Sequence, residues 1–208
     1  MAAQPTAEEI LARARLDPAR EPIRLAARLR VGRKLTPFVI NVARTVRYEF
    51  ENPAQVIELE PRADGFVLTE KFTDRPSSAV RVAQFDQRLR DSDITYEDLS
   101  MAFLYWPRPR LLGVETVTSR QCWKIEIQAP RGRSQYGVVR VWIDQASGAL
   151  LRLEGFDSGG RVVRRFSVIS AQPIEGQWML RQMRVESFDP DRRRIVSRTY
   201  IEVTGKAG

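Results

Sequence analysis

The chain of 208 residues contains no histidine at all. That absence excludes Ser-His-Asp and Cys-His catalysis, histidine-ligated zinc or haem, and a histidine pH switch. Its single cysteine, Cys122, leaves no intramolecular disulfide and no second thiolate for a metal. Because Cys122 neighbours Lys124 and Glu126 on the polar face of a predicted strand, we expect an inert, half-exposed thiol. Carboxylates remain the only general acid or base groups to consider.

Lysine is also scarce, since it supplies only four of the 34 basic residues. The net charge of +8 comes from arginines that are dispersed and interleaved with Asp and Glu, which favours a solvated surface over a polyanion partner. Two denser patches, Arg161/Arg164/Arg165 and residues 192–194, lie at predicted hairpin ends, where a solvated rim and a contact with anionic headgroups are both open. Aromatic residues fall at inward strand positions, so we expect no nucleic-acid binding.

Long hydrophobic runs are missing as well. The longest uncharged run, Leu35–Ala43, falls far short of the ~20 apolar residues of a membrane-spanning helix. Residues 1–5 show neither a basic n-region nor an apolar h-region, so we expect no signal peptide in this chain. No phosphate-binding glycine loop or G-x-S-x-G motif is present. We therefore expect a protein without a cofactor or a metal.

What the sequence does contain is a long series of strand patterns. In the second half, segments rich in β-branched and aromatic residues are separated by short turns, two of which contain Gly148 and Gly160. This pattern is typical of an antiparallel meander. The predicted strands are Leu111–Val117, Gln121–Ala129, Tyr136–Asp144, Ala149–Asp157, Val162–Ser170, Trp178–Phe188 and Ile195–Val203.

The first half has the same character. From Ile23 to Val31, apolar residues alternate with arginines, so one face of this strand is buried and the other is wet. Further strands are predicted at Pro37–Val42, Thr45–Phe50, Gln55–Glu60 and Gly65–Phe72, with a weak one at Ala79–Ala83. We predict a mainly β protein: a curved antiparallel sheet of about a dozen strands that forms an incomplete, half-open β-barrel, because long twisted sheets curl.

Two helices are predicted. Thr6 and Glu9 fit a capping box at the start of a short helix in the N-terminal segment 1–20. Thr95 and Asp98 fit another, followed by an almost wholly apolar run to Trp106. We expect this second helix to cover the concave side of the sheet as a lid, with Leu99 and Phe103 against Trp123 and Ile125, because it is too apolar to lie exposed.

The domain prediction is one domain over residues 1–208, divided into the N-terminal segment 1–20, a first meander at 23–83, the lid segment at 85–109 and a second meander at 110–203. The acidic residues Asp91, Asp93, Glu97 and Asp98 are interpreted as helix-start groups, with catalysis as the weaker alternative. The candidate residues of an apolar ligand cavity are Leu25, Leu29, Tyr48, Phe50, Leu59, Phe66, Leu68, Leu99, Phe103, Trp106, Trp123, Ile125 and Trp142.

Several segments together resemble one known family. They are Arg47–Pro53, Ser92–Leu99, Leu111–Gly113, Tyr136-Gly137 before Val141–Asp144, Phe156–Gly160 and Gly176–Trp178. With these the chain resembles the LolA-like outer-membrane lipoprotein-sorting proteins over about residues 25–203. The resemblance implies an incomplete β-barrel whose apolar concave side, covered by helices, accommodates acyl chains.

The resemblance also implies a function. It points to a non-enzymatic periplasmic carrier for the acyl chains of a lipoprotein or for free lipid, with an inner-membrane transporter or an outer-membrane acceptor as partner and with a signal peptide already removed. The alternative is a structural or docking module of the cell envelope that binds anionic headgroups or a membrane complex through its arginine-rich loops. An enzyme would need a carboxylate or metal mechanism that the sequence does not display.

Overall fold

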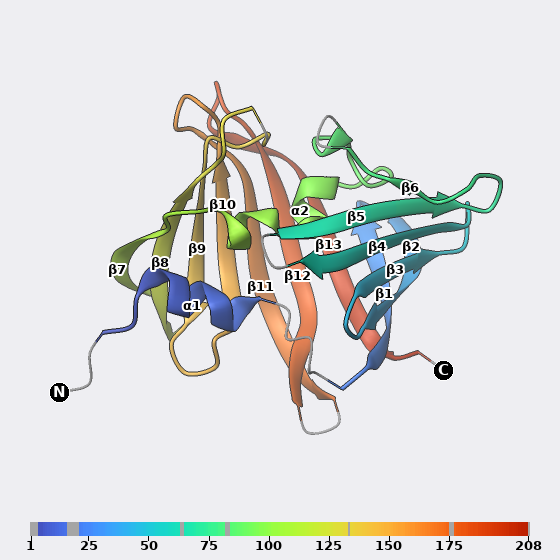
Figure 1. Ribbon diagram of the computed structural model, residues 1–208, viewed down its shortest axis with the longest axis horizontal. Helices are drawn as coiled ribbons and strands as arrows, with labels where there is room; N and C mark the ends of the chain where they lie inside the picture. Colours follow the sequence, from blue (N-terminus) through green and yellow to red (C-terminus); the bar gives the residue numbers. More distant parts are fainter. Residues whose placement is uncertain are drawn as a thin grey trace.

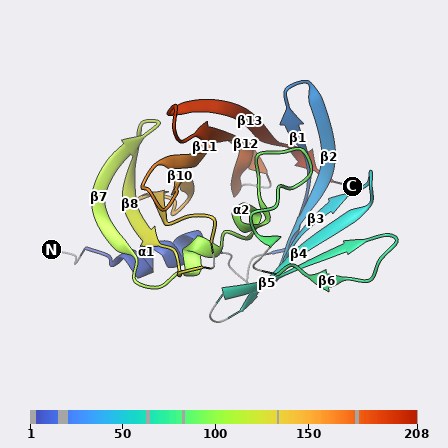
Figure 2. The ribbon, with the colours of Figure 1, turned by 90° about the horizontal axis from the view of Figure 1, so that it is seen from above.

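The computed structural model describes residues 4–15, 21–62, 65–81, 84–132, 134–174 and 177–207. Its 13 strands form a single antiparallel sheet in the order β6-β5-β4-β3-β2-β1-β13-β12-β11-β10-β9-β8-β7 (Figure 1). The end strands β6 and β7 do not pair with each other, so the sheet curls without closing into a barrel (Figure 2). The mainly β, half-open architecture predicted from the strand patterns is confirmed.

The strands follow the two predicted meanders. Their bounds are β1 Ile23–Val31, β2 Lys34–Val42, β3 Val46–Phe50, β4 Gln55–Arg62, β5 Gly65–Phe72, β6 Ser78–Ala79, β7 Arg110–Val117, β8 Arg120–Gln128, β9 Val138–Asp144, β10 Leu150–Phe156, β11 Val162–Ile174, β12 Gln177–Asp189 and β13 Arg194–Lys206. The first and last strands join the two meanders, with Leu25 opposite Lys206 and Val31 opposite Thr199. The concave side is therefore shared by both halves of the chain.

Three prolines lie inside strands, at or beyond the ends of the predicted strands. Pro37 falls within β2, Pro61 within β4 and Pro173 within β11. Strand β3 pairs with β2 only from Phe38 onward and with β4 only as far as Leu59, and β10 pairs with β11 only as far as Ser167. Each proline thus lies where its strand has a neighbour on one side, the setting in which a missing N–H is tolerated. The weak strand predicted at 79–83 is reduced to β6, and residues 82–83 lie outside the described part.

The predicted helix from Thr95 to Trp106 is not one helix. Helix α2 (Tyr96–Ser100) ends at Met101, which adopts a left-handed conformation with φ 49°, and a 3₁₀ turn, η2 (Ala102–Tyr105), follows. The Ser100 hydroxyl donates to Glu97 O at 2.7 Å and accepts from Ala102 N at 3.2 Å. A serine side chain that bonds the backbone on both sides competes with the helical ladder, which explains why the helix stops here.

Both predicted capping boxes are present. In helix α1 (Ala7–Ala14) the Thr6 hydroxyl accepts from Glu9 N, and in α2 the Thr95 hydroxyl accepts from Asp98 N. We call residues 92–106, which contain α2 and η2, the central segment. It lies inside the curl of the sheet, and α1 runs across the β7–β10 side (Figures 1 and 2).

The concave side carries two apolar clusters. The first belongs to the β1–β5 side and includes Leu89, Ile94 and Leu99, while the second belongs to the β8–β10 side and includes α1 and Phe103. A smaller cluster of Val117, Cys122 and Trp142 lies on the opposite face of the sheet. The expectation of a half-exposed Cys122 is therefore wrong: the side chain is fully buried, because Trp142 covers it on that outer face.

The outer face also accounts for many of the arginines. Neighbouring strands pair Arg198 with Glu186 at 2.9 Å, Arg165 with Glu154 at 2.8 Å, and Arg140 with Glu126 at 2.9 Å. Opposite charges directly across an antiparallel pair stabilise the sheet modestly. The dispersed basic residues thus alternate with inward apolar ones and are largely balanced by carboxylates.

Candidate functional site

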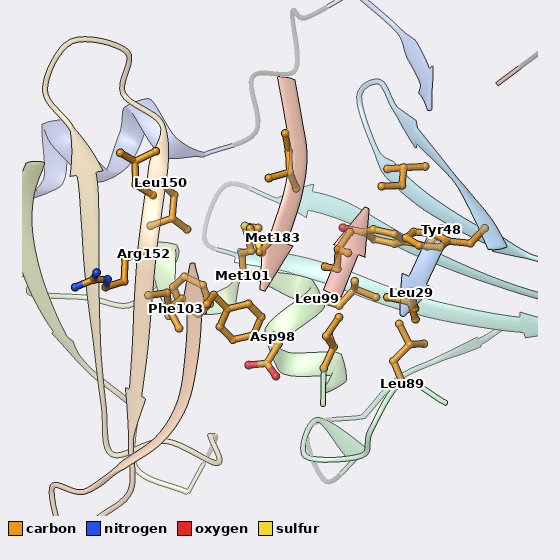
Figure 3. A pocket seen from close by; sticks show the side chains of 18 residues that line it. Leu29, Tyr48, Leu89, Asp98, Leu99, Met101, Phe103, Leu150, Arg152 and Met183 are labelled. Atoms are coloured by element: carbon orange, nitrogen blue, oxygen red, sulfur yellow. The ribbon is translucent and has the colours of Figure 1, made fainter. Parts of the chain in front are cut away.

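An apolar cavity of about 130 Å³ lies between the two concave clusters. Every lining side chain except Asp98 and Arg152 is aliphatic, aromatic or methionine, and Figure 3 shows them converging from both halves of the sheet. The lining residues are Leu29, Phe38, Ile40, Tyr48, Leu89, Ile94, Asp98, Leu99, Met101, Phe103, Leu150, Leu151, Arg152, Leu153, Phe166, Leu180, Met183 and Ile201.

The central segment contributes side chains to both apolar clusters that border this cavity. Leu99 packs with the first cluster, whereas Phe103 packs with the second, which contains Ile125. The expectation that both would pack against Trp123 and Ile125 is therefore wrong for Leu99. The left-handed turn at Met101 interrupts the helical spacing that would have placed the two side chains on one face. In Figure 3, Leu99 lies on the side of Leu29 and Tyr48, and Phe103 on the side of Leu150 and Arg152.

The partly exposed lining residues include Met101, Leu150, Leu180 and Met183, and we refer to these four as the mouth of the cavity. Helix α1 contacts η2 of the central segment. Arg15 donates from Nε and Nη2 to the carbonyl oxygen of Leu104, at 3.0 and 2.8 Å. The polar groups that reach the cavity are few, and burial raises the pKa of Tyr48 to about 12. Its hydroxyl is therefore uncharged at neutral pH.

Asp93 fastens the start of the central segment to the long strands. Its carboxylate accepts hydrogen bonds from the hydroxyls of Ser187 at 2.8 Å, Thr199 at 3.0 Å and Ser197. The backbone N–H of Asp93 in turn donates to the Thr199 hydroxyl at 2.8 Å. The side chain is 2% exposed. A buried carboxylate with three hydroxyl donors has its hydrogen-bonding capacity well satisfied. Asp93 therefore attaches the central segment to β12 and β13.

Asp98 fastens the middle of the segment. Its Oδ1 accepts from the Tyr136 hydroxyl at 2.5 Å, and its Oδ2 accepts from Thr95 N at 2.9 Å and lies 3.9 Å from Arg164 Nε. Burial raises the pKa of Asp98, and the charge of Arg164 and the Tyr136 hydrogen bond oppose that rise. Arg164 itself is only 8% exposed. The pair is thus an internal ion pair at the wall of the cavity.

Glu97 and Tyr96 complete the attachment on either side. Glu97 Oε2 accepts from Gln135 N at 3.0 Å, while burial raises the pKa of its carboxyl. On the opposite side the Tyr96 hydroxyl donates to Glu70, which also accepts from Gln55 Nε2 at 2.6 Å. The central segment is therefore held by polar contacts to both halves of the sheet.

The acidic residues of the predicted helix start are thus structural groups. Asp91 is exposed and pairs with Lys34, and the other three bind backbone and hydroxyl donors around the segment. Within the described ranges, no group of histidine, cysteine, aspartate or glutamate side chains could hold a metal ion. No helix of the described residues is long and apolar enough to cross a membrane. The site offers apolar surface and few reactive groups.

The predicted cavity residues separate into three places. Leu29, Tyr48, Leu99 and Phe103 line the cavity. Others lie in the surrounding clusters: Leu25, Phe50, Leu59, Phe66 and Leu68 in the first, and Trp106, Trp123 and Ile125 in the second. Trp142 lies on the outer face with Cys122, because it alternates with the inward residues Val141 and Ile143 along β9. Whether any of these residues touches a ligand stays a prediction.

Sequence reasoning missed the lining residues of the long strands, among them Leu153, Phe166, Leu180, Met183 and Ile201. Inward alternation could have identified Leu153 and Ile201, which share a face with neighbouring buried residues. Register shifts between Val168 and Ala171 disturb that alternation in β11 and β12. A bulge moves side chains to the other face, so Leu180 could not be placed from the pattern.

The arginine-rich hairpin ends are balanced by carboxylates. Arg161 pairs with Asp157 at 2.8 Å and with Asp191 at 2.6 Å, and Arg192 lies 3.9 Å from Asp189. Arg164 is buried, and Arg165 pairs with Glu154. These two patches are therefore less available to anionic headgroups than their sequence indicates.

Comparison with known proteins places the chain in a family. A family model with the description "-like: Uncharacterized protein" matches residues 75–205, more than half of the chain. None of the curated proteins compared with the chain matches it. Among solved structures, a DUF1329 family protein from Desulfovibrio piger superposes with a TM-score of 0.67 at 18% identity, covering 95% of this chain and 89% of that one.

The descriptions of two further similar structures name a known fold group. A LolA superfamily protein from Nitrosomonas europaea has a TM-score of 0.67 at 15% identity, with 97% of this chain and 92% of that chain covered. A putative outer membrane lipoprotein-sorting protein domain from Vibrio parahaemolyticus has a TM-score of 0.65 at 15% identity, with 95% and 88% covered. The chain therefore belongs to the family that matches residues 75–205, and its fold is that of the LolA-like outer-membrane lipoprotein-sorting proteins.

Proposed function

We propose that the protein is a non-enzymatic carrier that holds the acyl chains of a lipoprotein, or a free lipid, in the cavity between its two concave clusters. The observation that carries this proposal is the composition of the cavity, where only Asp98, Arg152 and the hydroxyl of Tyr48 interrupt an apolar lining. Burying apolar surface contributes roughly 25 cal/mol per Å², so an alkyl chain binds such a wall without a polar anchor. The fold of the lipoprotein-sorting domain supports the same proposal.

The size of the cavity limits how much of a chain it accepts in this form. A dry apolar cavity of about 150 Å³ holds a molecule such as benzene, and the cavity here measures about 130 Å³. It therefore accepts the end of an acyl chain, and a whole chain requires the opening beside Met101 and Leu180 to widen. Helix α1 contacts η2 and is held to the central segment through Arg15.

The setting we propose is the periplasm, where such a carrier shields acyl chains between the inner and outer membranes. Its partners would be an inner-membrane transporter that supplies the lipid and an outer-membrane acceptor that receives it. The alternative of a docking module that binds headgroups through the hairpins at residues 157–165 and 189–194 is less well supported, because Asp157, Asp189 and Asp191 already pair with arginines there.

The experiment combines lipid analysis with a blocked cavity. Native mass spectrometry and lipid extraction of the purified protein should reveal a bound fatty acid or phospholipid, and a fluorescent fatty acid should bind saturably. Leu180→Trp places an indole in the mouth and should weaken that binding by about tenfold, roughly 1.4 kcal/mol. Ile169→Trp is the matched control, because Ile169 is 43% exposed outside the cavity. Protein that is empty and ignores the probe, or equal effects of the two variants, would contradict the proposal.

A further inference from the structure

The hairpin of β11 and β12 leaves the sheet at its lower end in Figure 1. Strand β12 pairs with β13 only from Gln182 opposite Glu202 onward, whereas its earlier residues pair with β11 alone, as far as Gln177 opposite Ile174. Strand β13 meanwhile continues to Lys206 beside β1. The sheet therefore splits between β12 and β13, and the hairpin extends past the split as a two-stranded ribbon.

The ribbon carries an unusually exposed aromatic residue. Trp178 is 75% exposed, more than any other large hydrophobic residue in the described part of the chain, and its cross-strand neighbour Pro173 is also exposed. Tryptophan is normally well buried. Exposed tryptophans are enriched at interfaces where an apolar phase meets water, because the ring is apolar and its N–H is polar. Among the described residues, the Trp178 side chain forms no hydrogen bond or ring contact that would account for its position.

Positive charge lies near Trp178 along β12. A polar groove there is lined by Arg28, Arg181, Gln172 and Glu202 among others. Arg28 pairs with Glu202 at 2.6 Å, while Arg181 is exposed and forms no ion pair with any described residue. An exposed, unpaired arginine three residues from an exposed tryptophan combines charge for phosphate groups with an amphipathic ring for the headgroup layer.

The ribbon is also continuous with the wall of the cavity. Leu180 and Met183, which line the cavity, follow Trp178 along the same strand. Because a strand advances about 3.3 Å per residue, Trp178 stands roughly 7 Å beyond Leu180. Any surface that Trp178 enters is therefore brought close to the cavity mouth.

We propose that the end of this ribbon, formed by Pro173, Trp178 and Arg181, is a contact site for the surface of an anionic phospholipid bilayer. Trp178 enters the headgroup layer and Arg181 pairs with lipid phosphates. The overall charge of +8 complements such a surface. This inference goes beyond the proposed carrier function, since it concerns where the protein docks and requires no cargo in the cavity.

The test is co-sedimentation of the full chain with vesicles of phosphatidylglycerol and phosphatidylcholine, compared with vesicles of phosphatidylcholine alone. The wild-type protein should bind the anionic vesicles, and Trp178→Ser should weaken that binding on the order of tenfold. Arg181→Gln should weaken vesicle binding less than Trp178→Ser does. Raising the salt concentration from 0.1 to 1 M shortens the Debye length from about 10 to about 3 Å, so it should also weaken binding of the wild type, and the affinity lost by Arg181→Gln should account for part of that decrease.

The matched control is Leu35→Ser, which removes another exposed apolar side chain, 49% exposed, beside the β1–β2 turn at the other end of the strands. It should bind vesicles like the wild type. If Trp178→Ser binds as tightly as the wild type, the binding is a non-specific attraction of a basic protein, and the proposal is overturned. The proposal is also overturned if the wild type does not bind the anionic vesicles. Fatty-acid binding by Trp178→Ser should be unchanged, which separates this proposal from that of the carrier.

Discussion

The ring of Tyr136 occupies the space that a side chain on Gly155 would need. A Cβ at position 155 would stand 2.3 Å from Cε1 of Tyr136. The hydroxyl of the same tyrosine donates to Asp98 in the central segment at 2.5 Å. Glycine in β10 thus lets Tyr136 reach across the strand and hold α2 inside the curl of the sheet.

Gly155→Ala should therefore destabilise the protein, by about 1–3 kcal/mol as in other overpacked sites. The measurement is the free energy of unfolding in urea. Gly159→Ala serves as the control, because a Cβ there would meet only the flexible side chains of Asp157 and Arg161 at 3.3 Å or more. If Gly155→Ala is as stable as Gly159→Ala, Tyr136 has another position available and does not fix the segment.

Phe103→Ala tests whether the central segment is a movable lid, as the sequence predicts. Phe103 is 2% exposed and meets Trp106 edge-on, with ring centroids 6.4 Å apart. The structure therefore leads us to expect the full cost of truncating a buried phenylalanine, about 3–5 kcal/mol of unfolding free energy. A smaller loss, combined with faster exchange of a fluorescent fatty acid, would support the lid and contradict the anchored segment.

Glu97 makes stability depend on pH. Burial raises the pKa of its carboxyl above the ordinary 4.5, against hydrogen bonds from Ser134 and Gln135 and in concert with the nearby Asp98. A raised folded-state pKa contributes stability below the ordinary pKa and loses it as pH rises through the folded value. Relative to Glu97→Gln, the wild type should therefore gain stability between pH 7 and about pH 4.5, by about 1.4 kcal/mol for each unit of pKa elevation.

The measurement for Glu97 is urea unfolding of both proteins across that pH range. Glu60→Gln provides a comparison at an exposed carboxylate that pairs with Arg62. A constant difference between wild type and Glu97→Gln at every pH would show that Glu97 does not titrate as its burial implies.

Asp144 should show the opposite dependence. Arg120 donates to both of its carboxylate oxygens, at 3.0 and 2.5 Å, and lowers the pKa of Asp144 to about 2. The stability that the ionised Asp144 contributes is present above its ordinary pKa of 3.8 and is lost as pH falls toward 2. Because Arg120 is half exposed, we expect Asp144→Asn to cost only about 1 kcal/mol at pH 7.

For Asp144→Asn the unfolding free energies of wild type and variant should converge near pH 2. Ser147→Ala is an informative companion, since the Ser147 hydroxyl also donates to Asp144. Equal costs of Asp144→Asn at pH 7 and near pH 2 would show that the charge of Asp144 contributes nothing.

Local signals in the sequence were enough for the strands and caps. Alternation in Ile23–Val31 and the glycines at 148 and 160, both with positive φ, follow from backbone sterics and hydrophobic burial within a few residues. The same holds for the capping boxes at Thr6 and Thr95. The fold class, the number of strands to within one or two, and four of the cavity residues could be predicted in this way.

Only the tertiary structure decided how these elements meet. The pairing of β1 with β13 and the polar anchors from Asp93 to Ser187 and Thr199 join residues about 100 or more positions apart. The bulges between β11 and β12 turn Leu180 inward. The break at Met101 was missed although its cause is local: the buried Ser100 hydroxyl bonds to the backbone of Glu97 and Ala102. Contacts between distant residues leave no periodic trace in the chain, which is why the sequence determined the strands and the structure determined the cavity.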